Sequence, residues 1–332
     1  MTISPDPRAR PMQAHAALEA ATIRAAYAEI RVEFRASPQF VNETLSARLA
    51  APVVVKVESV NPIGSFKGRG TWLSVRDLVA RGVASADRPI VVASTGNFGQ
   101  GVAYAGRAFG VPIVVFADRH ANQTKLDRIR RLGATVIAEG EDFDAAREAS
   151  AVYASAHAAH LLVDGEEPTI ATGAATLALE LTDAVERGEL PRLENVYIPV
   201  GNGALIVGVG AWLRSVAPRC RVVGVQSDAA PAMTLSWRAR RPIETPTATT
   251  RAEGIATRVP VPEALELMDG RVDDMLLVSE EAIEAARVEF GAALGLTVEH
   301  AAAASWAGLL ADPGRTPGAS LVLITGTNVG TR

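Results

Sequence analysis

The stretch Asn61-Pro62-Ile63-Gly64-Ser65-Phe66-Lys67-Gly68-Arg69-Gly70 stands at a turn between two expected elements. The apolar run Pro52 to Val57 predicts a strand before it, and a helix is expected from Phe66 to Ala80, with Gly82 placed to end it. A lysine becomes a nucleophile when burial disfavours its charged form and packing holds it on a rigid element. Taken alone, the stretch fits a surface lysine in a glycine-rich turn better, so the rest of the chain has to decide.

Composition sets the broad class of the protein. The 332 residues are 48% hydrophobic and 21% charged, which suits a large globular chain with ample material for a core. The net charge of −4 and the lack of a long basic run argue against nucleic acid or an anionic membrane as a partner. Cys220 is the only cysteine, and no apolar stretch reaches the roughly 18 residues of a membrane span. The N-terminus has no secretory pattern, so we expect a soluble cytoplasmic protein.

From Pro89 onward, strand-length apolar runs alternate with helix-length segments, which predicts a doubly wound unit with a parallel sheet. The first series of strands is expected at Ile90 to Ala93, Ile113 to Ala117, Thr135 to Ala138 and Leu161 to Val163. A second series runs from the helix at Thr172 to Arg187 to a last strand at Ser320 to Ile324. We therefore predict an α/β protein with two doubly wound domains and open parallel sheets.

The expected domains divide the chain into three segments. Residues 1–84 form the first part of a large domain, with residues 1–14 as a loose arm. Residues 85–165 form a small domain, and residues 166–332 complete the large one.

Three polar loops follow expected strands, where ligands bind in doubly wound sheets. Ser94 to Gln100 offers hydroxyls, an amide and a helix N-terminus to a carboxylate, although a plain Ser/Thr helix cap explains it equally well. Pro199 to Leu205 is glycine-rich and suits a phosphate, and it lacks both the Gly-Lys-Ser/Thr of a P-loop and the acid that a dinucleotide site would place near Gln226. Ile324 to Asn328 puts a hydroxyl residue directly after the last strand, and alone it fits a polar C-terminal turn.

Together the four motifs resemble the fold-type II pyridoxal-phosphate enzymes (tryptophan synthase β-like), most closely the serine/threonine dehydratase and serine racemase family. Ser65-Phe66-Lys67-Gly68-Arg69-Gly70 is similar to that family's SFKxRG motif, and the other loops are similar to its asparagine loop, phosphate loop and SGGN. Arg251 to Ala256 resembles the family's ADGIA segment, with Glu253 in place of aspartate. The resemblance covers about Val53 to Asn328, with the motifs in the family's order.

The resemblance implies pyridoxal 5'-phosphate as cofactor, bound to Lys67 as a Schiff base, with Lys67 as the base that takes the Cα proton. Phe66 would pack beside the cofactor ring, Asn97 would bind its 3-hydroxyl oxygen and Thr325 would face its pyridine nitrogen. The remaining implied contacts fall into two groups. The phosphate would be held by Gly201, Asn202, Gly203, Ala204 and Leu205, and the substrate by Ser94, Thr95, Gly96, Asn97 and Gln100.

Several residues depart from the family's pattern. Thr95 stands where the racemase has a catalytic serine, so Thr95 is a second candidate catalytic residue but its bulk disfavours racemisation. Phe98 replaces the loop's usual histidine and favours a less polar substrate side chain. Gln226 stands where metal-activated relatives have a glutamate, so no metal site is expected. The chain ends soon after Thr325, so we expect no appended ACT-like regulatory domain.

The sequence therefore predicts a homodimeric ammonia-lyase that acts on a small-molecule amino-acid substrate. It would convert a β-hydroxy-α-amino acid, such as serine, threonine or a bulkier or acidic analogue, to a 2-keto acid and ammonia. A neutral Thr325 cannot hold a proton on the ring nitrogen as an aspartate would, which favours loss of a β-group over transamination. A β-replacement synthase is the alternative, and a racemase or a non-catalytic cofactor-binding relative are further ones.

Overall fold

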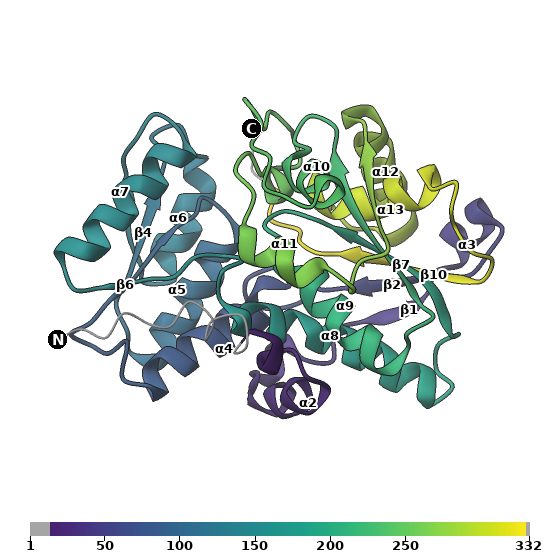
Figure 1. The fold of residues 1–332 in the computed structure, drawn as a ribbon, viewed down its shortest axis with the longest axis horizontal. Helices are drawn as coiled ribbons and strands as arrows, with labels where there is room; N and C mark the ends of the chain where they lie inside the picture. Colours follow the sequence, from purple (N-terminus) through teal and green to yellow (C-terminus); the bar gives the residue numbers. More distant parts are fainter. Residues whose placement is uncertain (1–13, 330–332) are drawn as a thin grey trace.

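The computed structural model describes residues 14–329, and two open sheets form its framework (Figure 1). Residues 1–13 of the predicted loose arm lie outside the described residues. The large sheet has the order β1-β2-β10-β7-β8-β9, and the small sheet has the order β5-β4-β3-β6. The strands of the large sheet are β1 (Gln39–Val41), β2 (Val53–Val57), β7 (Leu193–Pro199), β8 (Arg221–Ser227), β9 (Asp274–Val278) and β10 (Ala319–Ile324). Those of the small sheet are β3 (Ile90–Ala93), β4 (Ile113–Ala117), β5 (Thr135–Ala138) and β6 (His160–Leu161).

The predicted parallel sheets need one correction, at the edge of the large sheet. Strand β1 pairs antiparallel with β2, with Phe40 opposite Val55, whereas every other strand pair is parallel. Only the short helix α3 (Glu43–Leu49) and brief turns separate β1 from β2. This connection folds the chain straight back beside itself, which suits antiparallel pairing. The α/β class with parallel-rich sheets is confirmed.

Helices cover both faces of the large sheet, which explains strands that are apolar throughout. All five residues of β2 are buried. Val54 belongs to the apolar cluster that contains helices α8 (Pro168–Glu186) and α9 (Ala204–Val216). Val53 and Val55 belong to the cluster on the opposite face, with α12 (Glu280–Leu294) and α13 (His300–Ala311). Alternate side chains of one strand thus enter two separate cores.

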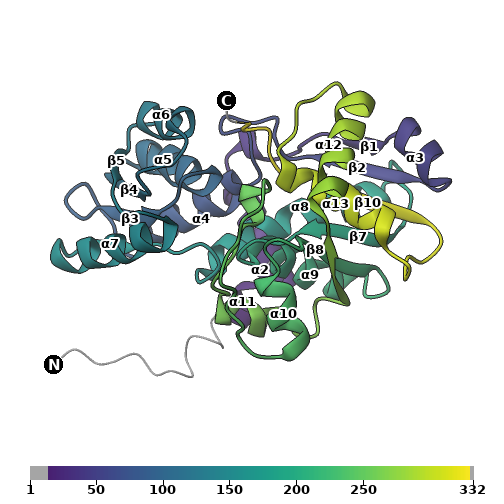
Figure 2. The same ribbon diagram turned by 90° about the horizontal axis from the view of Figure 1, so that it is seen from above.

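Helix α4 (Lys67–Ala80) lies between the two sheets and packs against α5 (Asn97–Phe109) and α8 (Figure 2). Its approach to α8 is very close: a Cβ at Gly70 would meet the Ile170 carbonyl oxygen at 2.5 Å. A Cβ at Gly173 would likewise meet the Gly70 Cα at 2.5 Å, so glycine is required on both helices. The first turn of α4, which carries Lys67, is therefore held firmly in place.

Most other element boundaries follow the sequence prediction. The bounds of β3, β4 and β5 are as predicted, but the fourth strand of the small sheet, expected at Leu161 to Val163, is β6 at His160–Leu161. Helix α8 starts at Pro168 rather than Thr172, because proline suits the first turn of a helix. Strands β1 and β9 and the short helices were not predicted. Further helices are α2 (Ala20–Glu29), α6 (Gln123–Arg131), α7 (Phe143–Ala156), α10 (Ala232–Ala239) and α11 (Pro262–Met268).

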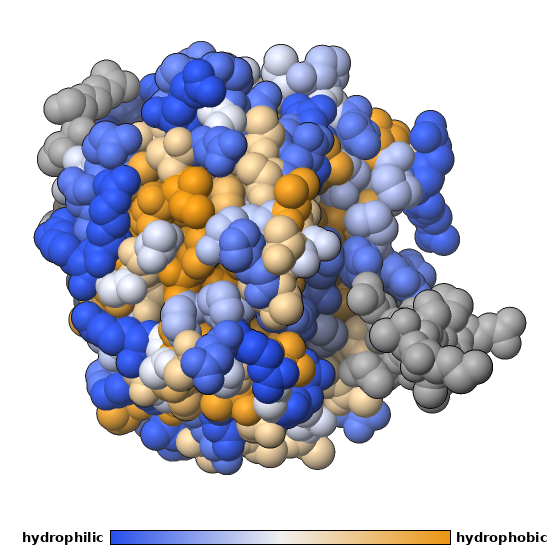
Figure 3. Space-filling model, turned by 90° about the vertical axis from the view of Figure 1, so that its left-hand side faces the viewer, coloured by the Kyte–Doolittle hydropathy of each residue, from blue (hydrophilic) through white to orange (hydrophobic). Residues whose placement is uncertain are grey.

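The surface on the side of the small sheet is mostly hydrophilic, with apolar surface gathered toward its middle (Figure 3). Helix α7 on this side exposes Phe143 and Val152. Within residues 14–329, no helix combines the length and the apolar character needed to cross a membrane.

Candidate active site

The carboxyl ends of three neighbouring strands of the large sheet bring distant parts of the chain together. Strand β10 lies between β2 and β7, and Ile324 stands opposite Val57 in the parallel register. The loops after β2 and β10 therefore start side by side, and Phe66 N donates a hydrogen bond to the Thr325 carbonyl oxygen (3.1 Å). Sequence positions about 260 residues apart thus become neighbours because parallel strands end at one edge of the sheet.

Lys67 begins α4 and points into a cavity rather than into solvent. Its side chain is 15% exposed, and its Nζ donates to Asp164 Oδ2 at 2.6 Å. The Nζ atom also lies 5.1 Å from the centre of the Phe66 ring and 5.7 Å from that of Phe98. Lys67 is therefore not the surface lysine that its glycine-rich turn alone favours.

The glycine-rich loop after β7 has the geometry of an anion site. Gly203 adopts a left-handed conformation (φ +97°), and the first hydrogen bond of α9 joins Val207 N to the Gly203 oxygen. The amides of Ala204, Leu205 and Ile206 consequently have no partner within the helix and sit at its positive end. A Cβ at Gly201 would meet the Gly254 carbonyl oxygen at 2.8 Å, so the loop is packed against the segment around Glu253. These features fit a phosphate group.

The loop after β3 presents Asn97 to the same region from the small sheet. The hydroxyl of Ser94 accepts from Gly96 N (3.2 Å) and Gly99 N (2.9 Å), so it fixes the turn as a cap would. Asn97 Nδ2 donates to both carboxylate oxygens of Glu299 (3.0 and 3.1 Å), and Asn97 Oδ1 accepts from Asn328 Nδ2 (2.7 Å). The Asn97 amide is thus oriented by a residue on each side of it.

These loops and α4 surround one cavity of about 1210 Å³. Twelve of the thirteen predicted site residues line it: Phe66, Lys67, Ser94, Thr95, Gly96, Asn97, Gly201, Asn202, Gly203, Ala204, Leu205 and Thr325. The cavity therefore joins a lysine, a phosphate-type loop, a carboxylate-type loop and a neutral hydroxyl residue. This set matches what a pyridoxal-phosphate cofactor and an amino acid need together.

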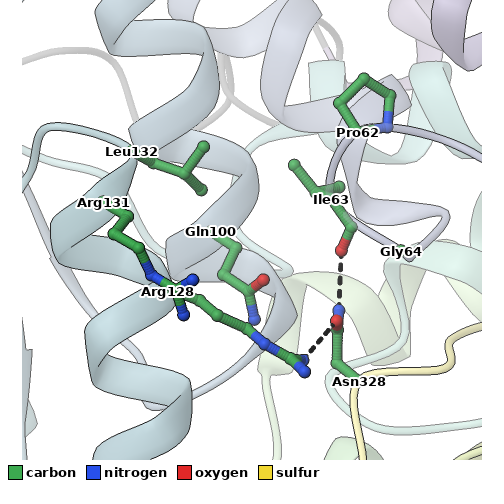
Figure 4. A pocket seen from close by; sticks show the side chains of 8 residues that line it. All are labelled: Pro62, Ile63, Gly64, Gln100, Arg128, Arg131, Leu132 and Asn328. Carbon is green, nitrogen blue, oxygen red and sulfur yellow. Dashed lines mark hydrogen bonds between the residues drawn. The ribbon is translucent and has the colours of Figure 1, made fainter.

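Gln100 is the one predicted site residue that lies elsewhere. It lines a second pocket of about 300 Å³ together with Arg128, Arg131 and Asn328 (Figure 4). Asn328 connects this pocket to the cavity, since its Oδ1 accepts from Arg128 Nη1 (2.7 Å) while its Nδ2 donates to the Ile63 carbonyl and to Asn97. The cavity lining gives no support to the predicted contact between Gln100 and the substrate carboxylate.

Two acidic residues of the site were missed by sequence reasoning. Asp164 lies just beyond β6 and pairs with Lys67. The sequence feature that could have indicated Asp164 is its position directly after an expected strand, at the edge of the sheet where ligands bind. Glu299 precedes α13 and holds both Asn97 and the backbone N–H of Asn328 (2.8 Å). Its partners are about 200 and 29 residues away, so nothing local in the sequence marks it.

Two ion pairs cross the rim of the cavity. Lys125 on α6 pairs with Glu253, and Asp144 on α7 pairs with Arg258. Both pairs connect helices of the small sheet to the segment between α10 and α11. They link the two sides of the cavity at its rim.

Other reactive residues take no part in the cavity. The side-chain oxygen of Gln226 is occupied by hydrogen bonds from Thr234 N (2.7 Å) and Thr234 Oγ1 (2.8 Å). The described residues contain no group of three His, Cys, Asp or Glu side chains that could hold a metal ion. Cys220 is buried, and burial raises the pKa of its thiol to about 12, so it is not a nucleophile near neutral pH.

The comparisons with known proteins agree with this geometry. The family model described as pyridoxal-phosphate dependent enzyme matches residues 35–326. An L-threonine ammonia-lyase of Thermotoga maritima is 35% identical over 242 residues, which cover 73% of this chain and 58% of that protein. An L-threonine ammonia-lyase of Geobacter sulfurreducens is 32% identical over 286 residues, which cover 85% of this chain and 68% of that protein. The chain therefore spans somewhat more than half of the first relative and about two thirds of the second.

Solved structures extend the likeness to the fold. A threonine deaminase from T.th. superposes with a TM-score of 0.87 at 26% identity, over 95% of this chain and 99% of that one. Maize serine racemase has a TM-score of 0.86 at 23% identity, over 94% of each chain, and shows a shared fold. Family model, relatives and structures agree, and this chain belongs to the family of pyridoxal-phosphate dependent enzymes.

Proposed function

We propose that this protein is an ammonia-lyase that converts a β-hydroxy-α-amino acid to a 2-keto acid and ammonia, with pyridoxal 5'-phosphate as its cofactor. One observation carries the proposal: Lys67, the loop from Gly201 to Leu205 and Thr325 line a single cavity. The names of the ammonia-lyase relatives support the same reaction.

The residues that would hold the cofactor are those with matching chemistry in the cavity. Lys67 would carry the covalent link, Phe66 would pack beside the ring, and the amides from Gly201 to Leu205 would bind the phosphate. Asn97 would reach the ring's 3-hydroxyl oxygen, and Thr325 its nitrogen. The cofactor supplies an electron sink for the bond that breaks at Cα. Ser94, Thr95 and Gly96 would receive the substrate carboxylate at the start of α5.

Proton transfer in this proposal depends on Lys67. With its amino group free, Lys67 would take the proton from Cα, and the β-hydroxyl would then leave with one proton as water. The product loses ammonia by adding one water molecule, so the substrate yields one 2-keto acid and one ammonia with no net water. Neither an oxidant nor a reductant is needed.

Thr325 favours loss of the β-hydroxyl group over the other reactions of the family. A neutral hydroxyl beside the ring nitrogen does not hold a proton there, whereas a carboxylate would. Negative charge on the substrate carbon is then less dispersed, so expulsion of a β-group is favoured over return of a proton. Thr95 adds a β-branched side chain to the carboxylate loop and leaves less room for proton return from the opposite side.

The residues that line the cavity also influence which substrate side chains it accepts. Phe98 is 6% exposed and lies on the cavity, so it replaces a polar surface with an aromatic one. Lys125 and Arg258 add positive charge near the rim, although each is paired with a carboxylate. We therefore include substrates with a bulkier or an acidic side chain beside serine and threonine.

We also propose that the protein works in the cytoplasm as a homodimer. The single buried cysteine suits a reducing compartment, since it can form no disulfide within the chain. Analytical ultracentrifugation of the purified protein tests the assembly, and a sedimenting species of about 35 kDa at every concentration would contradict the dimer.

The reaction is tested by screening the purified, cofactor-loaded protein for keto-acid release. The panel contains serine, threonine and β-hydroxy amino acids with aromatic or carboxylate side chains, in both configurations. Each is measured with and without an added thiol. Keto acid and ammonia in equal amounts are expected. A stable thioether with little keto acid would contradict the lyase and indicate β-replacement.

A further inference from the structure

The closest charged neighbour of Lys67 comes from the other sheet. Asp164 follows β6, and its Oδ2 lies 2.6 Å from Lys67 Nζ, with both side chains 15% exposed. This is the one hydrogen bond recorded for Asp164 in the part of the chain that the structure describes, and its Oδ1 is buried without a partner. No structural network accounts for a carboxylate at this position, so its burial points to the cavity.

The backbone around Asp164 is firmly held. Leu162 N donates to the Val91 carbonyl oxygen (2.9 Å) and continues the pairing of β6 with β3. Gly165 has a left-handed conformation (φ +99°), and a Cβ there would meet the Asn202 carbonyl oxygen at 2.9 Å. Asp164 is thus fixed between the small sheet and the loop that would hold the phosphate. Its carboxylate approaches Lys67 from a rigid support.

Three other carboxylates that line the cavity have side-chain partners of their own. Glu253 is paired with Lys125, Asp144 with Arg258, and Glu299 accepts from Asn97. The Phe66 and Phe98 rings also lie near Lys67 Nζ, with their centres at 5.1 and 5.7 Å. Among the described residues, Asp164 is therefore the one carboxylate within ion-pair distance of Lys67.

We propose that Asp164 is the positioning residue of Lys67. Its carboxylate holds the amino group at the β6 side of the cavity and keeps negative charge beside that nitrogen while the lysine gains and loses a proton. The inference rests on the proposed function, in which Lys67 takes the Cα proton. A carboxylate at hydrogen-bond distance stabilises the positively charged nitrogen, and a rigid partner limits the positions that a flexible lysine can occupy.

The test compares D164N with the wild type and with D118N. Asp118 directly follows β4, lines the same cavity and serves as a matched strand-end acid, because within residues 14–329 its side chain accepts only from the nearby His120 N (3.0 Å). Borohydride reduction and mass measurement establish that each protein carries the cofactor on Lys67. The visible absorbance of the bound cofactor is then titrated with pH, and exchange of the substrate Cα proton with D2O is followed by NMR.

In D164N the pH midpoint of the absorbance change should fall by about one unit or more, because loss of the negative charge disfavours the protonated nitrogen. Cα proton exchange should slow by about tenfold or more, with KM changed by less than about threefold, because the base is no longer held in place. D118N should stay within about twofold of the wild type in exchange rate. An unchanged midpoint or an unchanged exchange rate in D164N overturns the proposal. If the wild type exchanges the Cα proton but releases no keto acid, the proposed lyase reaction fails while the role of Asp164 stands or falls by the same two readouts.

Discussion

Lys67 and Arg69 stand two residues apart on the first turn of α4, yet their surroundings are opposite. Lys67 faces the cavity and has one charged partner, Asp164. Arg69 is fully buried and donates to Glu58 and Glu180, with N···O distances between 2.7 and 3.0 Å. Successive residues of a helix are about 100° apart, so positions two apart point to nearly opposite sides. One turn of helix thus carries both the lysine that faces the cavity and the arginine that anchors the helix.

The anchor is a balanced cluster of four buried charges. Lys56 on β2 donates to Glu180 Oε2 at 2.7 Å and lies 3.7 Å from Glu58, so two cations meet two carboxylates. Burial by itself would raise the pKa of Glu180, but the charges of Arg69 and Lys56 outweigh it and lower this pKa to about 2. The cluster joins β2, α4 and α8, which are the elements that set the position of Lys67. The comparison shows a fully buried cation with two carboxylate partners at one position and, two residues away, a cation that faces the cavity with one partner.

The largest expected effect is on cofactor attachment and activity, and it comes from replacing Lys67. K67A should remove the covalent attachment of the cofactor and lower any lyase activity by about 10³-fold or more, because both the link and the base are lost. The free energy of unfolding should change little. The measurements are the visible absorbance of the loaded protein and keto-acid release. K125A is the matched control, since Lys125 also lines the cavity, and it should keep the absorbance band. Persistence of the band in K67A would show that another residue carries the cofactor.

The second largest effect is on the free energy of unfolding, and it comes from replacing Arg69 in the buried cluster. R69M keeps an apolar chain of similar length but leaves Glu58 and Glu180 without their main partner. We expect the free energy of unfolding to fall by about 3–5 kcal/mol, as for other broken buried pairs. Urea unfolding followed by circular dichroism measures it. R76A on the same helix removes an exposed pair with Glu29 and should cost less than about 1 kcal/mol. Equal effects of the two variants would contradict the distinction between anchor and surface pair.

The pH dependence of the free energy of unfolding tests whether the charges of the buried cluster stabilise the fold. The folded pKa of Glu180 is below its ordinary value, so its contribution is present above about pH 4.5 and is lost as the pH falls toward 2. A fall from 4.5 to about 2 corresponds to on the order of 3 kcal/mol. E180Q should therefore differ most from the wild type at neutral pH, and the difference should shrink in acid. Unfolding measured from pH 7 to pH 2 checks this, with E29Q as an exposed control. A constant difference over that range would show that the charge of Glu180 is not the cause.

The smallest effect on the free energy of unfolding is expected from the ion pair between Glu253 and Lys125 at the rim of the cavity. Glu253 is 63% exposed, so its pair with Lys125 resembles an ordinary surface salt bridge more than the buried cluster. E253Q should change the free energy of unfolding by less than about 1 kcal/mol, and added salt should reduce the difference further. Thermal unfolding at low and high salt measures both. A loss as large as that of R69M would mean that the rim, too, anchors the fold.

Sequence reasoning succeeded where local pattern and chemistry coincide. Strands that are apolar throughout predicted sheets covered on both faces, and the loops after them supplied most of the cavity lining. It failed at β1 and β9, the two edge strands of the large sheet. Strand β1 has only three residues, whereas β9 has the apolar run Met275 to Val278, which was overlooked. Gln100 was predicted to bind the substrate carboxylate, and the structure places it on a second pocket. Spacing along a loop does not show in which direction the next helical turn points a side chain.

The sequence by itself determined the family, and it predicted a cofactor lysine and the loops that surround it, because each depends on residue types in a fixed local order. Only the tertiary structure decided that Asp164 meets Lys67, that Glu299 orients Asn97, and that Arg69 lies in a balanced buried cluster. These contacts join positions 97, 202 and 111 residues apart. They depend on how the two sheets pack across α4, which no local pattern encodes, and they establish that Lys67 faces a carboxylate inside the cavity.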